Sequence, residues 1–310
     1  MSGTIVVSAP ASSANLGPGF DCAAVALDLW NVLRVGALAD GAASVSIEGE
    51  GARELPRDRE HLALRAFALI APLEQWSFRF LNRIPLERGL GSSAASVAVG
   101  LLAACAVSGL ELPPDRLLEL GEPLEGHADN LAAALRGGVC LSWKVGARIS
   151  SSRIASELPL HAIVVVPAGR LNTSQSRARL PEFLRHDEAA AAAAAAALLG
   201  AAIASGDAEL FAAALRDRLH EPFRIADVPV LRELRGRPVR GSAGATLSGS
   251  GPSVVVWAPA QAAAAVAAEL ERRFPDARIL PLAVAPHGAR AEQPPADPQT
   301  AADAGIGAHV

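Results

Sequence analysis

An eleven-residue run of glycine, serine and small apolar residues constrains this chain more than any other stretch. It consists of Pro85, Leu86, Glu87, Arg88, Gly89, Leu90, Gly91, Ser92, Ser93, Ala94 and Ala95. A strand-like segment, residues 76–81, precedes it, and a long apolar segment, residues 96–107, follows it. Its two glycines allow the backbone to turn tightly and to approach a ligand closely. The run therefore predicts a strand–loop–helix unit.

The start of that helix is a candidate anion site. Ser92 and Ser93 can cap it, and its free N–H groups and helix dipole attract a phosphate, which we expect to belong to a nucleotide. Lys144 is the only lysine, so the Gly-Lys-Ser/Thr of a Walker loop is missing. Backbone N–H groups, arginines and a metal must then hold the phosphate. The alternative is a capped joint without a ligand, and the full motif favours the phosphate.

Composition narrows the class of protein. The chain has 310 residues, of which 51% are hydrophobic, enough for one large domain or two modest ones. A net charge of -4 without a basic block argues against nucleic acid and anionic membrane as partners. Three scattered cysteines are typical of reduced thiols in the cytoplasm. The alanine run at residues 189–204 is too weakly hydrophobic for a membrane span. We therefore expect a cytoplasmic protein.

Apolar periodicity and turn residues give the order of the other elements. Strands are expected at residues 4–9, 23–35, 45–47, 139–143, 162–166, 243–248, 254–257 and 278–284. Helices are expected at residues 61–71, 113–124, 189–204, 208–219, 230–234 and 260–274. Polar loops are expected at residues 10–21 and 172–180. The predicted division is an N-terminal domain at 1–150, a C-terminal domain at 151–285, and a disordered tail at 286–310.

Several separated motifs occur in an order that resembles the GHMP small-molecule kinases and, within them, the homoserine kinases. They are PASSANLGPGFD at residues 10–21, the run at 85–95, and LSGSGPS at 247–253, together with EGHADN at 125–130 and EPFR at 221–224. The resemblance covers residues 5–285. It implies an α+β GHMP-kinase fold of two fused α/β halves with the active site in the cleft between them. The N-terminal half would be like domain 2 of ribosomal protein S5, and the C-terminal half would be ferredoxin-like.

The resemblance also implies a reaction. The γ-phosphate of ATP would pass, with Mg²⁺, to the side-chain hydroxyl of L-homoserine, giving O-phospho-L-homoserine on the way to threonine. By matched position, residues 85–95 would bind the ATP phosphates, and Ser93 and Glu119 would hold Mg²⁺. Substrate would contact Asn15, Asp21, His127, Asn130, Thr173, Arg177 and Arg224. The catalytic set would be Asn130, Glu119 and Ser93.

The chemistry of a zwitterionic alcohol suits these residue types. Its carboxylate fits the guanidinium of Arg177 or Arg224, which can donate two parallel hydrogen bonds. Its ammonium fits Asp21 and Asn15. Phosphoryl transfer depends mainly on positioning and charge neutralisation, so no general base is assigned. Taken singly, each of these residues has a structural alternative, such as a turn cap or an exposed ion pair.

His61 departs from the family pattern. Other functions also stay open. His61 stands where relatives often have an asparagine, which leaves the contacts to the nucleotide base open. The nearest alternative is a GHMP kinase for threonine or mevalonate; the two arginines argue for an α-carboxylate, and a mevalonate-type enzyme would usually show an aspartate base here. The second alternative is a non-catalytic regulator on the same fold, and Glu119, Ser93 and Asn130 argue against it. The sequence does not determine the oligomeric state, and a homodimer remains open.

Overall fold

The first of two sheets contains both ends of the described chain. The computed structural model describes residues 4–38, 44–171 and 173–292, without the side chains of Thr173 and Ser174. Its first sheet has the order β11-β1-β2-β4-β3, and β5 pairs with β2 and with β6. Only β3 and β4 run parallel. The strands are β1 (Ile5–Asn15), β2 (Gly19–Ala37), β3 (Ser44–Gly49), β4 (Trp76–Asn82), β5 (Val139–Val145), β6 (Arg148–Ala155) and β11 (Arg290–Glu292).

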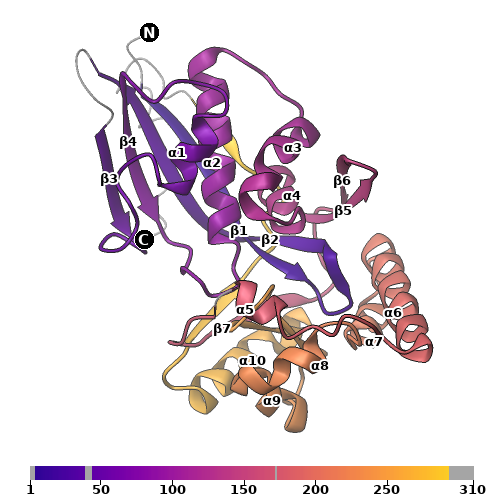
Figure 1. The fold of residues 1–310 in the computed structure, drawn as a ribbon. Helices are drawn as coiled ribbons and strands as arrows, with labels where there is room; N and C mark the ends of the chain where they lie inside the picture. The colour runs from indigo at the N-terminus through magenta and orange to yellow at the C-terminus, as the bar shows by residue number, and fades with distance from the viewer. Residues whose placement is uncertain (1–3, 39–43, 172, 293–310) are drawn as a thin grey trace.

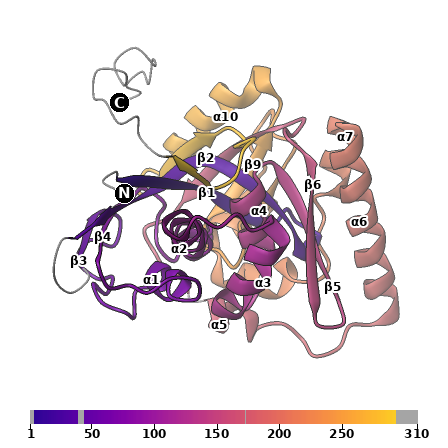
Figure 2. The same ribbon diagram turned by 90° about the horizontal axis from the view of Figure 1, so that it is seen from above.

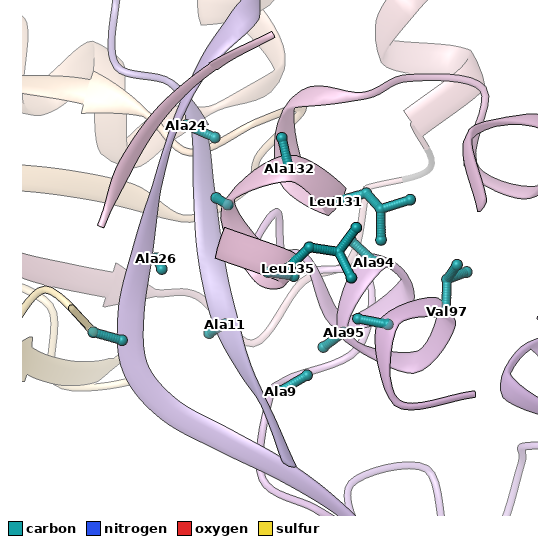
Figure 3. Packing of buried hydrophobic residues seen from close by; sticks show 14 of the residues in the cluster. Ala9, Ala11, Ala24, Ala26, Ala94, Ala95, Val97, Leu131, Ala132 and Leu135 are labelled. Atoms are coloured by element: carbon teal, nitrogen blue, oxygen red, sulfur yellow. The ribbon is translucent and has the colours of Figure 1, made fainter. Parts of the chain in front are cut away.

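Four helices cover this sheet: α1 (Leu62–Phe67), α2 (Ser92–Ser108), α3 (Pro114–Glu125) and α4 (Asp129–Arg136). Both α2 and α4 pack directly on β1 and β2, and α1 and α3 pack on those helices (Figures 1 and 2). The contact is made by small side chains, because alanines of β1 and β2 face Ala94 and Ala95 of α2 (Figure 3). Small residues let the helix approach the sheet closely. The first turn of α2 is therefore held beside β1.

The second sheet is antiparallel and has the order β10-β7-β9-β8. Its strands are β7 (His161–Val166), β8 (Gly244–Leu247), β9 (Val254–Ala258) and β10 (Arg278–Leu282). The helices here are α5 (Thr173–Arg177), α6 (His186–Ser205), α7 (Ala208–Ala214), α8 (Glu221–Arg224), α9 (Pro229–Gly236) and α10 (Ala260–Arg273), with a 3₁₀ turn at Ile225–Asp227. Figure 1 shows this part below the first sheet, with α6 and α7 to one side.

Strand β7 shows how the two halves share one interior. Ala162, Val164 and Val166 belong to the main hydrophobic core, which the first sheet also enters. Ile163 and Val165, on the opposite face, belong to a smaller core beneath α9 and α10. Successive strand residues point to opposite faces, so a strand buried on both sides is apolar throughout. The two halves therefore form one packed body with a site between them.

The two-part α+β architecture is confirmed, but residues 10–21 are not a loop. Strand β1 runs to Asn15 and β2 begins at Gly19, so only a tight turn separates them. Positive φ angles at Asn15 (75°), Leu16 (46°) and Gly17 (81°) make this turn. The small residues of the run, read as loop-forming, instead pair in register with β2. The predicted polar loop at 172–180 likewise contains the short helix α5.

The structure also bears on the predicted domain boundary at residue 150 and on the predicted start of the tail at residue 286. Hairpin β5–β6 belongs to the first sheet and ends at Ala155, so a division at residue 150 would cut β6. Strand β11 pairs with β1, and the N–H of Ala289 donates to the carbonyl of Ala134 at 2.7 Å. The prediction of disorder from residue 286 is therefore wrong for residues 286–292. Residues 293–310 lie outside the described part of the chain.

Helix α6 is long and apolar enough to cross a bilayer by length and composition alone, with a mean hydropathy of 1.6. Alanine supplies most of that value, and a single helix of this kind is weak evidence for a membrane span. The three cysteines are free thiols, as expected, with Cys105 and Cys140 buried.

Candidate active site

A cavity of about 520 Å³ opens between the two halves. The end of β1 and the start of β2 line it, as do residues 85–93, Ser96, residues 127–130 apart from Ala128, and parts of α5 and α8. Residues 249–250 complete the wall. Motifs that are far apart in the sequence therefore meet around one space. The part lined by residues 85–93 and the part lined by Asp21, Arg177 and Arg224 differ in construction.

The glycine run forms the floor of the cavity. Residues 85–93 line it, whereas Ala94 and Ala95 lie in the core beneath, which narrows the predicted run by two residues. Gly89 and Gly91 have φ angles of 73° and 64°. A Cβ on Gly89 would overlap the carbonyl of Ser248, and one on Gly91 would overlap Ser12 Oγ. Glycine is therefore required here both by conformation and by space.

The start of α2 follows immediately. Its first N–H groups have no acceptor within the helix, so the cavity floor ends in a cluster of backbone donors. The loop before them is fixed from both sides. Asn31 Oδ1 accepts the N–H groups of Arg83 at 2.8 Å and Ile84 at 3.0 Å. The Arg88 guanidinium donates to the carbonyls of Pro167 at 2.9 Å and Ala168 at 2.7 Å, which ties the loop to the second half.

The carboxylate beside Ser93 is not the predicted one. Ser93 Oγ donates to Glu125 Oε2 at 2.9 Å, whereas Glu119 pairs with Arg116 at 2.9 Å; neither glutamate is among the residues that line the cavity. The two glutamates are six residues apart on α3, which places them about a third of a turn from one another around the helix. Burial raises the pKa of the Glu125 carboxyl, and its neighbours Ser93 and His127 only partly oppose this.

The segment between α3 and α4 supplies a linked polar group. Asp129 Oδ1 lies 3.1 Å from His127 Nδ1 and accepts the N–H of Asn130 at 2.7 Å. Burial lowers the pKa of His127, but Asp129 and Glu125 outweigh it and raise the pKa above its usual value. Asn130 Oδ1 accepts Ser12 Oγ at 2.8 Å, and its Nδ2 donates to no residue that the structure describes. Asp129 was not predicted, although it lies within the EGHADN motif.

Where Asp21, Arg177 and Arg224 line the cavity, Arg224 is buried, with 3% of its surface exposed. Its Nε donates to the carbonyl of Ser176 at 3.3 Å, and no carboxylate in the described ranges pairs with it. Burial lowers the pKa of Arg224, and the nearby Arg177 adds to that effect. A guanidinium stays protonated in proteins, so this is a buried positive charge without an acidic partner. Such a charge is chemically suited to an anionic ligand.

Arg177 is arranged differently. Its two terminal nitrogens donate to the two carboxylate oxygens of Asp21, each at 2.7 Å, and both side chains are about 40% exposed. Asn15 holds Asp21 in place, because its Oδ1 accepts the Asp21 N–H at 3.1 Å while its Nδ2 donates to the carbonyl of Gly249. Phe20 lies beneath Arg177 and Arg224, with ring centroid distances of 5.4 and 5.3 Å. Sequence reasoning missed Phe20.

The opposite end of the cavity is lined by Leu55, Leu62 and His61. His61 begins α1, and its Nδ1 accepts the N–H of Ala63 at 3.2 Å. Burial lowers its pKa to about 4, so the ring is neutral at pH 7 and its proton is on Nε2. That Nε2 is buried and has no partner among the described residues. The side chain of Thr173 lies outside the described part, so its predicted contact stays a prediction.

Comparison with known proteins agrees with this geometry. Residues 61–138 match the family model of the GHMP kinases N-terminal domain, and residues 194–276 match the GHMP kinases C-terminal model. The homoserine kinase of Moorella thermoacetica is 34% identical, over 92% of this chain and 98% of its own. That of Gloeobacter violaceus is 37% identical with the same two coverages.

A solved structure resembles the whole fold. The crystal structure of homoserine kinase from Cytophaga hutchinsonii superposes with a TM-score of 0.82. It is 25% identical and covers 94% of this chain and 98% of its own. The likeness therefore includes both halves and the cleft between them, and this chain belongs to the homoserine kinases of the GHMP kinase family.

Proposed function

We propose that this chain transfers the γ-phosphoryl group of ATP to the side-chain hydroxyl of L-homoserine, forming O-phospho-L-homoserine and ADP. One observation supports this most strongly: buried Arg224 has no acidic partner among the described residues and lines the same cavity as the lysine-free glycine loop. A carboxylate-binding position beside a phosphate-binding floor fits a kinase whose acceptor is an amino acid.

The nucleotide fits along the glycine loop. Its triphosphate would lie over residues 85–93, where backbone N–H groups and the α2 dipole neutralise negative charge. The apolar end formed by Leu55 and Leu62 suits a purine ring. The Nε2–H of His61 is a donor there that suits a ring nitrogen of the base.

The metal would be held by Ser93 and Glu125. Mg²⁺ prefers oxygen ligands and is commonly bound by one or two protein groups together with substrate phosphates. The Ser93 hydroxyl and the Glu125 carboxylate are adjacent oxygen donors at the end of the phosphate floor. A bound cation would favour the charged form of Glu125, which burial disfavours. When bound, Mg²⁺ neutralises charge on the phosphates; Glu119 does not fit this role.

The amino acid would be bound by its two charges where Asp21, Arg177 and Arg224 line the cavity, a part that we call the amino-acid end. Arg224 would take the carboxylate, and Asp21 the ammonium. Asp21 is paired with Arg177, so substrate binding would replace one ion pair by two. The substrate carboxylate would then satisfy both arginines, which Phe20 holds on one surface. Asn15 would act mainly by fixing the orientation of Asp21.

The reacting hydroxyl would lie near Asn130 and His127. The Asn130 amide can donate to an oxygen of the acceptor or of the γ-phosphate, and Ser12 fixes its orientation. His127 is oriented by Asp129 and carries positive charge more readily than a free histidine. These groups position the reactants and stabilise charge, which is most of what a loose phosphoryl-transfer transition state requires. No general base is assigned, and we place the reaction in the cytoplasm.

Release of ADP tests the proposal. The protein would be incubated with Mg-ATP and homoserine, threonine, serine or mevalonate in turn, and ADP would be measured by a coupled assay. We expect release with homoserine at a kcat/KM at least about tenfold above the other three. Release only with mevalonate would overturn the substrate, and no release with any acceptor would favour a non-catalytic regulator.

A further inference from the structure

One buried titratable side chain near the amino-acid end has no role in the reaction described above. His220 directly precedes α8, and none of its surface is exposed. It does not line the cavity, yet its ring contacts two groups that do. A fully buried imidazole requires partners for both nitrogens, so these contacts define its state.

The hydrogen bonds of His220 determine its tautomer. Its Nδ1 lies 3.2 Å from Nη1 of Arg224, and a guanidinium can only donate, so Nδ1 is the acceptor. The proton of the neutral ring is then on Nε2, which donates to the carbonyl of Gly17 at 2.9 Å. Gly17 lies in the β1–β2 turn of the first half, whereas Arg224 lies on α8 of the second. The ring therefore joins the two halves.

Burial and the neighbouring charge of Arg224 keep the ring neutral. Burial lowers the pKa of His220, and the charge of Asp217 opposes this. Asp217 Oδ2 lies 3.6 Å from Nε2, but it already accepts the N–H groups of His220 at 2.7 Å and Glu221 at 2.6 Å. Protonation would also place a second positive charge against Arg224. Asp217 thus caps the start of α8 rather than charging the imidazole.

The ring also supports Phe20. The two rings stack with centroids 5.0 Å apart and an angle of 25° between their planes. Phe20 in turn carries Arg224 and Arg177 on its surface. His220 therefore touches Arg224 directly through Nδ1 and indirectly through Phe20. Moving the imidazole would disturb two contacts of the arginine at once, leaving its bonds to the carbonyls of Ser176 and Gly249.

We propose that His220 is a positioning residue, a neutral imidazole that joins the β1–β2 turn to α8 and holds Arg224 and Phe20 in the arrangement that binds the substrate carboxylate. This inference rests on the proposed function for the identity of that carboxylate. A displacement of about 1 Å in a binding group can lower the rate about a hundredfold, so a residue behind the site can control it.

A set of three variants tests this role. His220→Asn keeps an acceptor near the position of Nδ1, His220→Gln keeps a donor near Nε2, and His220→Ala keeps neither. We expect His220→Ala to raise the KM for homoserine about tenfold to a hundredfold and to change the KM for ATP less than about twofold. His220→Asn should retain a lower homoserine KM than His220→Gln, because it preserves the bond to Arg224.

Other results would contradict the proposal. A lower Tm with both KM values unchanged, or equal rises in both, would show a merely structural role. If His220→Ala does not fold, equal homoserine KM values for His220→Asn and His220→Gln would overturn it. His61→Asn is the matched control at the other end, where the KM for ATP should move instead.

A measurement without substrate separates this inference from the proposed function. The ¹⁵N shifts of the His220 imidazole should show a neutral ring protonated on Nε2 at pH 7 and above. A charged ring at pH 7, or the opposite tautomer, would overturn the positioning role even in an active enzyme. Inactivity of the wild-type protein with homoserine would instead overturn the proposed function, and the shifts would still report the tautomer.

Discussion

The two ends of the cavity are built in different ways. The phosphate floor comes from one continuous segment, residues 85–93, and presents mostly backbone. The amino-acid end combines side chains from separate elements, among them Asp21 near the start of β2, Arg177 of α5 and Arg224 of α8. Backbone donors need only a local conformation. Opposed charges need the whole fold to bring them together and to control their pairing.

The two ends also differ in the interactions that hold them in place. The floor is fixed by glycines that no other residue can replace without overlap, at Gly89 and Gly91. The amino-acid end depends on one buried cation, Arg224, and one exposed ion pair, Arg177 with Asp21. Exposed pairs contribute little, whereas a buried charge is strongly affected by its surroundings. Substitutions at the two ends should therefore change different kinetic constants, and by different amounts.

The largest effect is expected at Gly91, which begins α2 with φ 64° and ψ 29°. Gly91→Ala should lower kcat/KM by at least about a hundredfold, because its Cβ would overlap Ser12 Oγ, which orients Asn130. Gly109 ends the same helix with φ 64° and ψ 28° and has open space around it. Gly109→Ala therefore has the same backbone strain and should keep its activity; equal losses would show that strain alone matters.

The next largest effects are expected at Arg224 and Arg177, and they should differ in size. Arg224→Ala should raise the KM for homoserine about a hundredfold and leave the KM for ATP nearly unchanged, because a buried charge pair is worth about 2–5 kcal/mol. Arg177→Ala should raise the homoserine KM only about tenfold or less, since that side chain is 43% exposed. Initial rates with each substrate varied in turn would measure both. Equal effects on the two substrates would remove Arg224 from the amino-acid end.

His61 should respond to acid. Its pKa is about 4 in the folded protein and 6.5 in the unfolded chain, so between these values the unfolded state binds more protons. The free energy of unfolding is then fully retained above pH 6.5 and falls as the pH drops towards 4, by roughly 3 kcal/mol. His61→Asn should lose this dependence. Urea unfolding at pH 7.5 and pH 4.5 would measure the free energy of unfolding of the two proteins. An equal change between the two pH values in both proteins would contradict a buried neutral imidazole.

The smallest effect is expected from the C-terminal residues. Removing residues 293–310, which are rich in alanine and proline, should change neither KM nor Tm by a measurable amount. Removing residues 287–310 also deletes β11 and the Ala289–Ala134 hydrogen bond, and should lower the Tm by several degrees. Thermal melts of both truncated proteins would test this. A loss of activity in the shorter deletion would show that residues 293–310 take part in the site.

Predictions from the sequence failed where pairing in space, rather than local pattern, decides the outcome. Residues 10–21 have the composition of a loop, yet residues 10–15 pair with β2 because the sheet satisfies their backbone groups. Strand β11 has no apolar alternation and forms only because β1 offers a free edge. Two alanine-rich helices also differ, since α2 is largely buried whereas α6 buries only Leu199, Ala202 and Ile203. Composition alone does not distinguish them.

The sequence by itself determined the phosphate floor, since two glycines followed by serines at the start of an apolar helix prescribe that backbone locally. It also determined the order of the motifs, and with it the family. Only the tertiary structure decided that Glu125 rather than Glu119 meets Ser93, that Asp21 pairs with Arg177, and that His220 supports Arg224. Those choices depend on side-chain directions and burial across elements far apart in the chain, which local sequence patterns do not encode.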